Sequence, residues 1–225
     1  MATLKELTYM VLDELKLSSD DSFFNEEHIA FLINKYRNFI LKQQYKDIRK
    51  DIPESNYQIA NVELIEVPAI SGIPCEGGTF LKSKNKISFL LPVGTNRIYT
   101  EGYYNKEISL ISKERFRYIG YNKWLKDFIY ATLGPDSYLY LNSANPQFLE
   151  LENIYITGIF ENPEEVYDLN NPSEYSFADS HYPLEEALIP PVIELVVKEL
   201  SVPRYSPEDN TNNAKDDLAE VKQSK

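Results

Sequence analysis

The stretch YQIANVELIEV, residues 57–67, decides the fold class, because apolar and polar residues alternate along it with the period of a β-strand. Before it, apolar residues recur every three or four positions, as in helices. After it, further alternating segments are separated by turn signals and lie at 78–91, 96–104, 107–121 and 151–160. FIYATLGPDSYLYL, residues 128–141, predicts a hairpin around Gly134-Pro135-Asp136. The middle of the chain is therefore expected to form an antiparallel sheet or small sandwich.

Two helices are predicted upstream of this stretch. Thr3 and Glu6 form the capping-box pattern T-x-x-E, which marks a helix start. Asn25 is a favourable N-cap for a second helix of about 25 residues that ends at Pro53. A short loop between the two helices favours an antiparallel pair.

A third helix is predicted near the C-terminus. Residues 161–183 are acidic and contain several prolines, so they are interpreted as a long surface connection. Pro190 and Pro191 suit the first turn of a helix whose apolar residues indicate burial.

The predicted fold is α+β: an antiparallel helical bundle with an inserted antiparallel β-sheet or sandwich and an extended C-terminal arm. The expected divisions are an N-terminal helical hairpin at 1–56, the β insertion at 57–162, the acidic connection and closing helix at 163–202, and the arm at 203–225.

Composition restricts the function classes. The 225 residues carry a formal net charge of -12, which argues against a general nucleic-acid binder. Cys75 is the single cysteine, so no disulfide forms within the chain and folding in a reducing, intracellular compartment is expected. The N-terminus lacks the pattern of a secretion signal, and no apolar run is long enough to span a bilayer, so a soluble protein is expected.

Positive charge is concentrated in residues 80–126, which hold ten Lys or Arg and three Glu, a net of +7 against -19 for the remainder. Strand spacing would place two trios each on one face: Lys82, Lys84 and Lys86, and Lys113, Arg115 and Arg117. Each trio could bind phosphates or an acidic partner, including the next copy of the chain. A solvated sheet face that protects an edge is the alternative, and the favoured interpretation of each trio alone.

Motifs for catalysis or metal binding are incomplete. DNTNNAKDDLAE, residues 209–220, places Asp209, Asn213 and Glu220 at EF-hand positions, but Ala214 replaces the required glycine and no exit helix follows. A calcium site is therefore disfavoured against an exposed polar tail. His28 and His181 are the only histidines, and Cys75 has no C-x-x-C partner. The sequence predicts no enzyme and no cofactor.

Longer segments carry a family resemblance. VPAISGIPCEGGTFLKSKNKI (67–87), the run from YIGYNKW to IFENPEE (118–165), PLEEALIPPVIELVVKEL (183–200) and NNAKDDL (212–218) together resemble a ring protein of crAss-like bacteriophages. These proteins belong to the wider group of head–tail adaptors of short-tailed phages.

The resemblance implies a structural virion protein that assembles in the host cytoplasm and lies in the neck or tail. The implied partners are further copies in a homo-oligomeric ring, expected to be a dodecamer, the phage portal protein, and the next tail ring or tail protein. Genomic DNA would pass through the channel without specific binding, and no membrane is involved. A nucleic-acid-binding module that uses the cationic strand faces is the alternative.

Candidate partner contacts come from the cationic trios, from an aromatic residue that could anchor an interface, and from the arm. Pro203 and Pro207 are expected to keep the arm extended, and Ala214, Leu218 and Val221 could form an apolar stripe once it docks on the portal or the next subunit. The full set is Lys82, Lys84, Lys86, Lys113, Arg115, Arg117, Trp124, Pro203, Tyr205, Pro207, Ala214, Leu218 and Val221.

Overall fold

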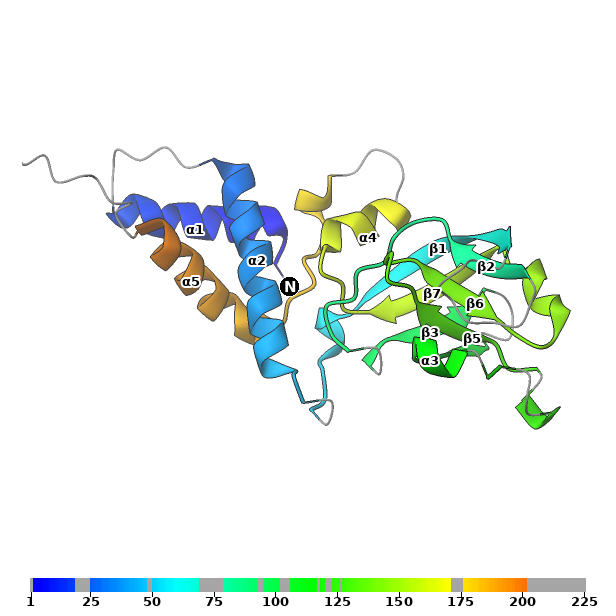
Figure 1. The fold of residues 1–225 in the computed structure, drawn as a ribbon. Coiled ribbons are helices and arrows are strands. Elements are labelled where there is room, and N and C mark those ends of the chain that lie inside the picture. Colours follow the sequence, from blue (N-terminus) through cyan, green and yellow to red (C-terminus); the bar gives the residue numbers. More distant parts are fainter. Residues whose placement is uncertain are drawn as a thin grey trace, which may run out of the picture.

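The computed structural model describes residues 2–18, 25–47, 50–68, 79–92, 95–101, 106–116, 118–119, 123–125, 127–170 and 176–201. It confirms the α+β class. Three helices lie together at one side and a β-barrel at the other, with a fourth helix next to the barrel (Figure 1). The longer helices are α1 (Leu4–Ser18), α2 (Glu26–Gln44), α4 (Pro163–Asn170) and α5 (Ile189–Ser201).

The seven strands close into a barrel in the order β1-β2-β6-β5-β4-β3-β7. The strands are β1 (Gln58–Pro68), β2 (Thr79–Ser83), β3 (Arg97–Thr100), β4 (Glu107–Leu110), β5 (Tyr130–Leu133), β6 (Leu139–Asn142) and β7 (Asn153–Gly158). All neighbours pair antiparallel except β4 and β5, which are parallel. The expected wholly antiparallel sheet or sandwich is therefore corrected to a closed barrel with one parallel pair.

The barrel interior is filled by side chains from alternate strand positions. In β7, Ile154 and Ile156 are buried while Asn153, Tyr155 and Thr157 are partly exposed. They pack with apolar residues of the other six strands, so the barrel has its own continuous core.

The predicted hairpin forms β5 and β6. Its turn is closed by a hydrogen bond from Gly134 N to Tyr138 O at 2.8 Å. Ser137 at the end of the turn has φ 64°, the left-handed conformation that three-residue hairpin loops require.

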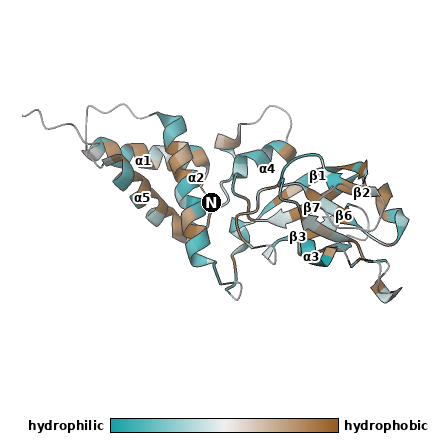
Figure 2. Ribbon diagram, viewed as in Figure 1, coloured by the Kyte–Doolittle hydropathy of each residue, from teal (hydrophilic) through white to brown (hydrophobic). Residues whose placement is uncertain are grey.

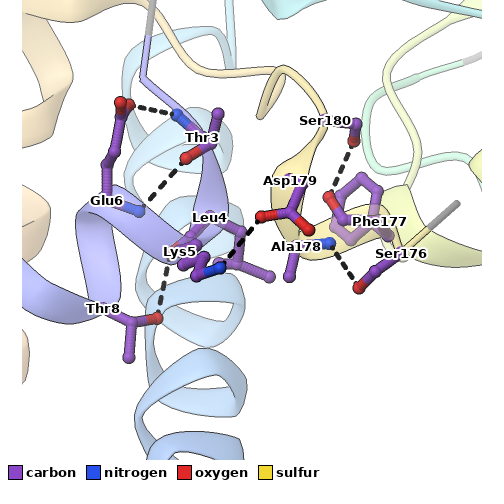
Figure 3. A network of polar contacts seen from close by, with 10 residues as sticks. All are labelled: Thr3, Leu4, Lys5, Glu6, Thr8, Ser176, Phe177, Ala178, Asp179 and Ser180. Atoms are coloured by element: carbon purple, nitrogen blue, oxygen red, sulfur yellow. Dashed lines mark hydrogen bonds and ion pairs between the residues drawn. The ribbon is translucent and has the colours of Figure 1, made fainter.

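The start of α1 confirms the predicted capping box. Glu6 N donates to Thr3 Oγ1 at 3.1 Å, and Thr3 N donates to the Glu6 carboxylate at 2.9 Å (Figure 3). Beside it, Lys5 pairs with Asp179 at 3.3 Å. The first turn of α1 thus contacts the segment that precedes α5 in the sequence.

The N-cap of α2 is confirmed, because Asn25 Oδ1 accepts from Glu27 N at 3.0 Å. The helix ends at Gln44, earlier than Pro53, because Tyr45 leaves the helical conformation while its N–H still reaches Leu41 O. In Figure 1, α1 and α2 cross, so the expected antiparallel bundle is corrected to three helices packed at differing directions.

The sequence had indicated that the segment after β7 is a long surface connection, but the structure shows a helix and buried residues in it. It contains α4, with Pro163 in its first turn and Glu164 and Glu165 near its N-terminus, where carboxylates favour the helix dipole. Further along, Phe177 and Tyr182 are buried in the helical core.

The C-terminal helix α5 is confirmed and begins with the Pro190-Pro191 pair. It consists mainly of hydrophobic residues interrupted by hydrophilic ones (Figure 2). Val192 and Val196 are almost completely buried against α1 and α2. This burial joins α1 and α5 in one core.

Candidate assembly surfaces

Arg37 joins the helices to the barrel side of the molecule. Its side chain is completely buried on α2, and Nε donates to Pro183 O at 2.9 Å while Nη1 donates to Phe160 O at 3.0 Å. The guanidinium carbon lies 5.8 Å from the centre of the Tyr182 ring. Burial lowers the pKa of Arg37, because removal from water disfavours the charged form. The two carbonyls and the ring offset part of that cost.

Polar side chains of α2 extend this junction along one helix face. Asn34 and Asn38 each donate to Glu161 O, at 3.2 and 2.8 Å, and Lys42 pairs with the Glu161 carboxylate at 3.0 Å. Since these residues follow helical spacing, α2 is held at three successive turns by Glu161, through its backbone carbonyl at two turns and its carboxylate at the third. These contacts attach α2 to the segment that follows β7.

A groove of about 910 Å³ runs between α1 and α5. Its apolar residues are Met10, Ile189, Pro190, Ile193 and Val197, and its polar residues are Glu14, Glu186, Glu194 and Lys198. Three carboxylates against one ammonium give the groove a net negative charge. Apolar concavities with a charged rim are typical of protein-binding sites.

The outer face of α2 carries exposed aromatic side chains. Phe31 is 64% exposed and stacks on His28 with ring centres 6.5 Å apart, and Phe39 follows two turns later. Between them, Lys35 pairs with Glu199 of α5 at 2.8 Å. That hydrogen bond holds the pKa of the Glu199 carboxyl below its ordinary value, helped by the hydroxyl of Tyr36.

A second aromatic surface lies at the far end of the barrel. Trp124, in the short helix η3 (Lys123–Leu125), is 78% exposed, and Tyr118, Leu125 and Phe128 nearby are also exposed. In Figure 1 this helix projects from the lower right of the barrel, away from α1 and α5. Exposed apolar patches of this kind mark interaction surfaces.

The first cationic trio does not share one strand face. Lys82 belongs to β2, is mostly buried, lies 3.7 Å from the Tyr138 ring centre and pairs with Asp136 at 3.6 Å. Lys84 follows the end of the strand and pairs with Glu63 at 2.6 Å. Lys86 is exposed beyond the same strand end. Two of these three charges are thus compensated within the chain.

The two described members of the second trio lie on a helix and not on a strand. Lys113 and Arg115 lie in the short helix α3 (Lys113–Phe116), where Phe116 is buried against Phe80. The backbone N–H groups of Arg115 and Phe116 both reach Ser112 O, which closes a helical turn in place of a strand. Arg117 lies outside the described residues.

The arm candidates lie outside the described residues: Pro203, Tyr205, Pro207, Ala214, Leu218 and Val221, with the calcium-loop positions Asp209, Asn213 and Glu220. Among the residues that the structure describes, no cluster of three or more metal-ligating side chains occurs. No helix within the same residues is long and apolar enough to cross a bilayer.

Comparison with known proteins decides the family. The family described as Phage tail ring protein 2 matches residues 6–218. The chain belongs to this family. It is also 53% identical over 224 residues to Ring protein 2 of Bacteroides phage crAss001, an alignment that covers 98% of this chain and 100% of that protein. The resemblance to crAss-like phage ring proteins is thereby confirmed.

For this phage tail ring protein 2 family member, sequence reasoning missed the groove and the buried arginine. Arg37 was detectable in principle, because it falls beside Ile33, Ile40 and Leu41 on the apolar face of α2. The groove has no comparable signal, since its two walls lie about 180 residues apart.

Proposed function

We propose that the chain is a structural, non-enzymatic protein of the phage virion that forms a ring in the head–tail connector. Copies of the chain surround the DNA channel below the portal, expected as a dodecamer, and the ring provides a platform for the next tail ring. The membership in the tail ring protein 2 family carries this proposal.

The described surfaces support assembly. A ring needs two different surfaces on each copy, one for each neighbour. The chain exposes aromatic residues on α2 and at the barrel tip, and an acidic groove between α1 and α5. The net charge of -12 suits a channel wall along which DNA slides without binding, because phosphate affinity needs cations.

Two ion pairs weaken the alternative of a nucleic-acid-binding module. Lys82 and Lys84 are paired with carboxylates, so they contribute little to a phosphate-binding surface. DNA affinity that falls steeply with salt, and falls again on charge reversal of Lys113 and Arg115, would restore this alternative.

In the proposed organisation, the parts at 1–56 and 163–202 form the helical unit and 57–162 the barrel unit, except that α4, at the start of 163–202, packs on β1 of the barrel. The arm at 203–225 contacts the portal or the next subunit.

Electron microscopy of purified virions and of the isolated chain tests the proposal. We expect closed rings of the isolated chain, or of the chain with its portal, and matching density in the neck. A chain that is absent from the virion neck would contradict the proposed function.

A further inference from the structure

In the part of the chain that the structure describes, two exposed apolar surfaces of opposite charge lie at opposite ends of the molecule. The groove between α1 and α5 is at one end, and the barrel tip, formed by Tyr118, Trp124, Leu125 and Phe128, is at the other (Figure 1). We infer that the barrel tip of one copy inserts Trp124 and Leu125 into the groove of the next copy. The inference rests on the proposed ring, and it names the two surfaces that join its subunits.

The groove combines apolar and acidic side chains. Met10 and Ile193 line it, and Met10 is 45% exposed although its side chain is apolar. Glu14 on α1 and Glu194 on α5 line it as well. The segments that form it are acidic as a whole, because α1 and residues 184–201 hold three Lys and seven Asp or Glu, a net of -4. The matching partner is a small apolar projection in a cationic surrounding.

The barrel tip has this combination. Trp124 is 78% exposed, Phe128 44% and Leu125 42%. Residues 106–128, which contain the tip, hold six Lys or Arg and three Asp or Glu, a net of +3. Lys106 Nζ lies 5.8 Å from the centre of the Phe128 ring, so one ammonium group stands beside the apolar surface. The two surfaces therefore match in apolar character and are opposite in charge.

The positions of the two surfaces require a second copy. Helices α1 and α5 lie at one end of the molecule and η3 at the far end of the barrel, so the tip of a copy does not reach its own groove (Figure 1). Contact of one tip with another would bring like charges together. A contact of tip with groove is heterologous, and every copy that gives its tip still offers its groove. Successive copies then join head to tail, and a fixed rotation between them closes a ring.

The dimensions of the groove suit the tip. Ile189 and Val197 on α5 both line the groove and are eight residues apart, about 12 Å along the helix axis. The three residues of η3 extend over about 6 Å by the 3-10 rise per residue. A groove of about 910 Å³ can therefore cover the short helix together with the Trp124 ring. Tryptophan in a desolvated pocket is a common centre of binding energy in protein interfaces.

Site-specific cross-linking between two tagged copies tests the inference. Cys75→Ser first removes the native thiol. One full-length copy carries Met10→Cys in the groove, and a second copy with a different mass tag carries Leu125→Cys at the tip. We expect a short bis-maleimide to give tagged heterodimers in mixed assemblies, formed by the chain alone or with its portal. Tyr9→Cys is the matched control, because Tyr9 is 48% exposed on the same helix but does not line the groove; it should cross-link several-fold less.

Substitutions that leave both cysteines in place add a second readout. Trp124→Ala in the tip copy should lower the cross-linking yield about tenfold, the loss typical of a central aromatic anchor. Phe31→Ala in the same copy is its control, because Phe31 is an aromatic residue of α2 with 64% exposure and should leave the yield unchanged. Glu194→Lys in the groove copy should lower the yield roughly twofold to fivefold, the effect expected for exposed ion pairs. Raised salt should lower it in the same direction.

Three outcomes would overturn the inference. Absence of heterodimers, or equal cross-linking of Met10→Cys and Tyr9→Cys, would show that the tip does not enter the groove. Cross-linking of Met10→Cys to Phe39→Cys of a second copy, without cross-linking to Leu125→Cys, would show that α2 of the neighbour occupies it. Rings that still form in these cases leave the proposed function intact, whereas absence of the chain from the virion neck contradicts the function itself.

Discussion

Replacing Arg37 by Met is expected to destabilise the chain, because it removes the donors that join α2 to the backbone of two distant segments. Met retains an apolar chain of similar length, so the cavity left behind is small. Phe160 O and Pro183 O, both buried, lose their donors. Each such unsatisfied acceptor costs about 1–3 kcal/mol, or roughly 2–6 kcal/mol together.

Relief of the buried charge offsets part of this loss. Within the described part of the chain, Arg37 contacts no carboxylate; its partners are two backbone carbonyls, the Asn38 amide oxygen and the Tyr182 ring. Since burying a charge carries a desolvation cost, we take relief of about 1–3 kcal/mol from its removal and expect a net loss of about 1–3 kcal/mol. For a chain of this size that corresponds to a fall in Tm of roughly 2–12 °C.

Thermal and urea denaturation followed by circular dichroism measure the effect. Arg97→Met is the matched control, because Arg97 is exposed on β3 and its loss should change stability by less than about 0.5 kcal/mol. Hydrogen exchange should also quicken at residues 159–161 in Arg37→Met. A variant as stable as the parent would refute the reasoning, since it would show that the burial cost of the guanidinium cancels its hydrogen bonds.

Three further predictions concern the barrel. Burial and the hydrogen bond to Asp136 raise the pKa of Tyr140 to about 12. The stability that this shift contributes is therefore complete below about pH 10 and is lost between about pH 10 and 12. Tyr140→Phe should remove that part of the alkaline loss of stability, as measured by urea denaturation at each pH. Gly158→Ala should cost about 1–3 kcal/mol, because its Cβ would stand 2.5 Å from Asn96 Oδ1; unchanged stability would mean that Asn96 moves aside freely. Trp124→Ala should leave the stability of the free subunit within about 0.5 kcal/mol while lowering the fraction assembled; equal assembly by mass photometry would exclude the barrel tip from the ring contacts.

Local signals in the sequence predicted local structure well. Thr3 with Glu6, Asn25, and the Pro190-Pro191 pair each marked a helix start, because capping and proline preferences depend on residues only a few positions apart. The predicted hairpin around Gly134 is confirmed for the same reason, because its turn signal is also local.

The errors arose where distant contacts override a local pattern. Lys113 to Phe116 alternate like a strand, but Phe116 is buried against Phe80 and Tyr140, and a single helical turn places it there. Four residues are too few to distinguish the two periods. Barrel closure depends on the parallel pairing of β4 with β5, strands about 20 residues apart, and alternation alone carries no information about which strands are neighbours.

The candidate contacts remain predictions for a similar reason. A lysine that alternates along a strand looks the same in sequence whether it is solvated or paired, and only the fold shows that Lys84 meets Glu63. Trp124 could have been buried or exposed by composition alone, and the structure places it in solvent. Whether Trp124 contacts a neighbouring copy is tested by the Trp124→Ala assembly measurement.

The packing of α1 and α2 against α5 sets an order of events during synthesis. The two N-terminal helices leave the ribosome first, but the helix that covers them is completed only at residue 201. Every barrel strand has emerged by Gly158, so the barrel can close while the apolar faces of α1 and α2 are still uncovered. A nascent chain interrupted before Ile189 would carry a finished barrel and an open helical core, which makes incomplete products of this protein prone to aggregation and ready substrates for chaperones.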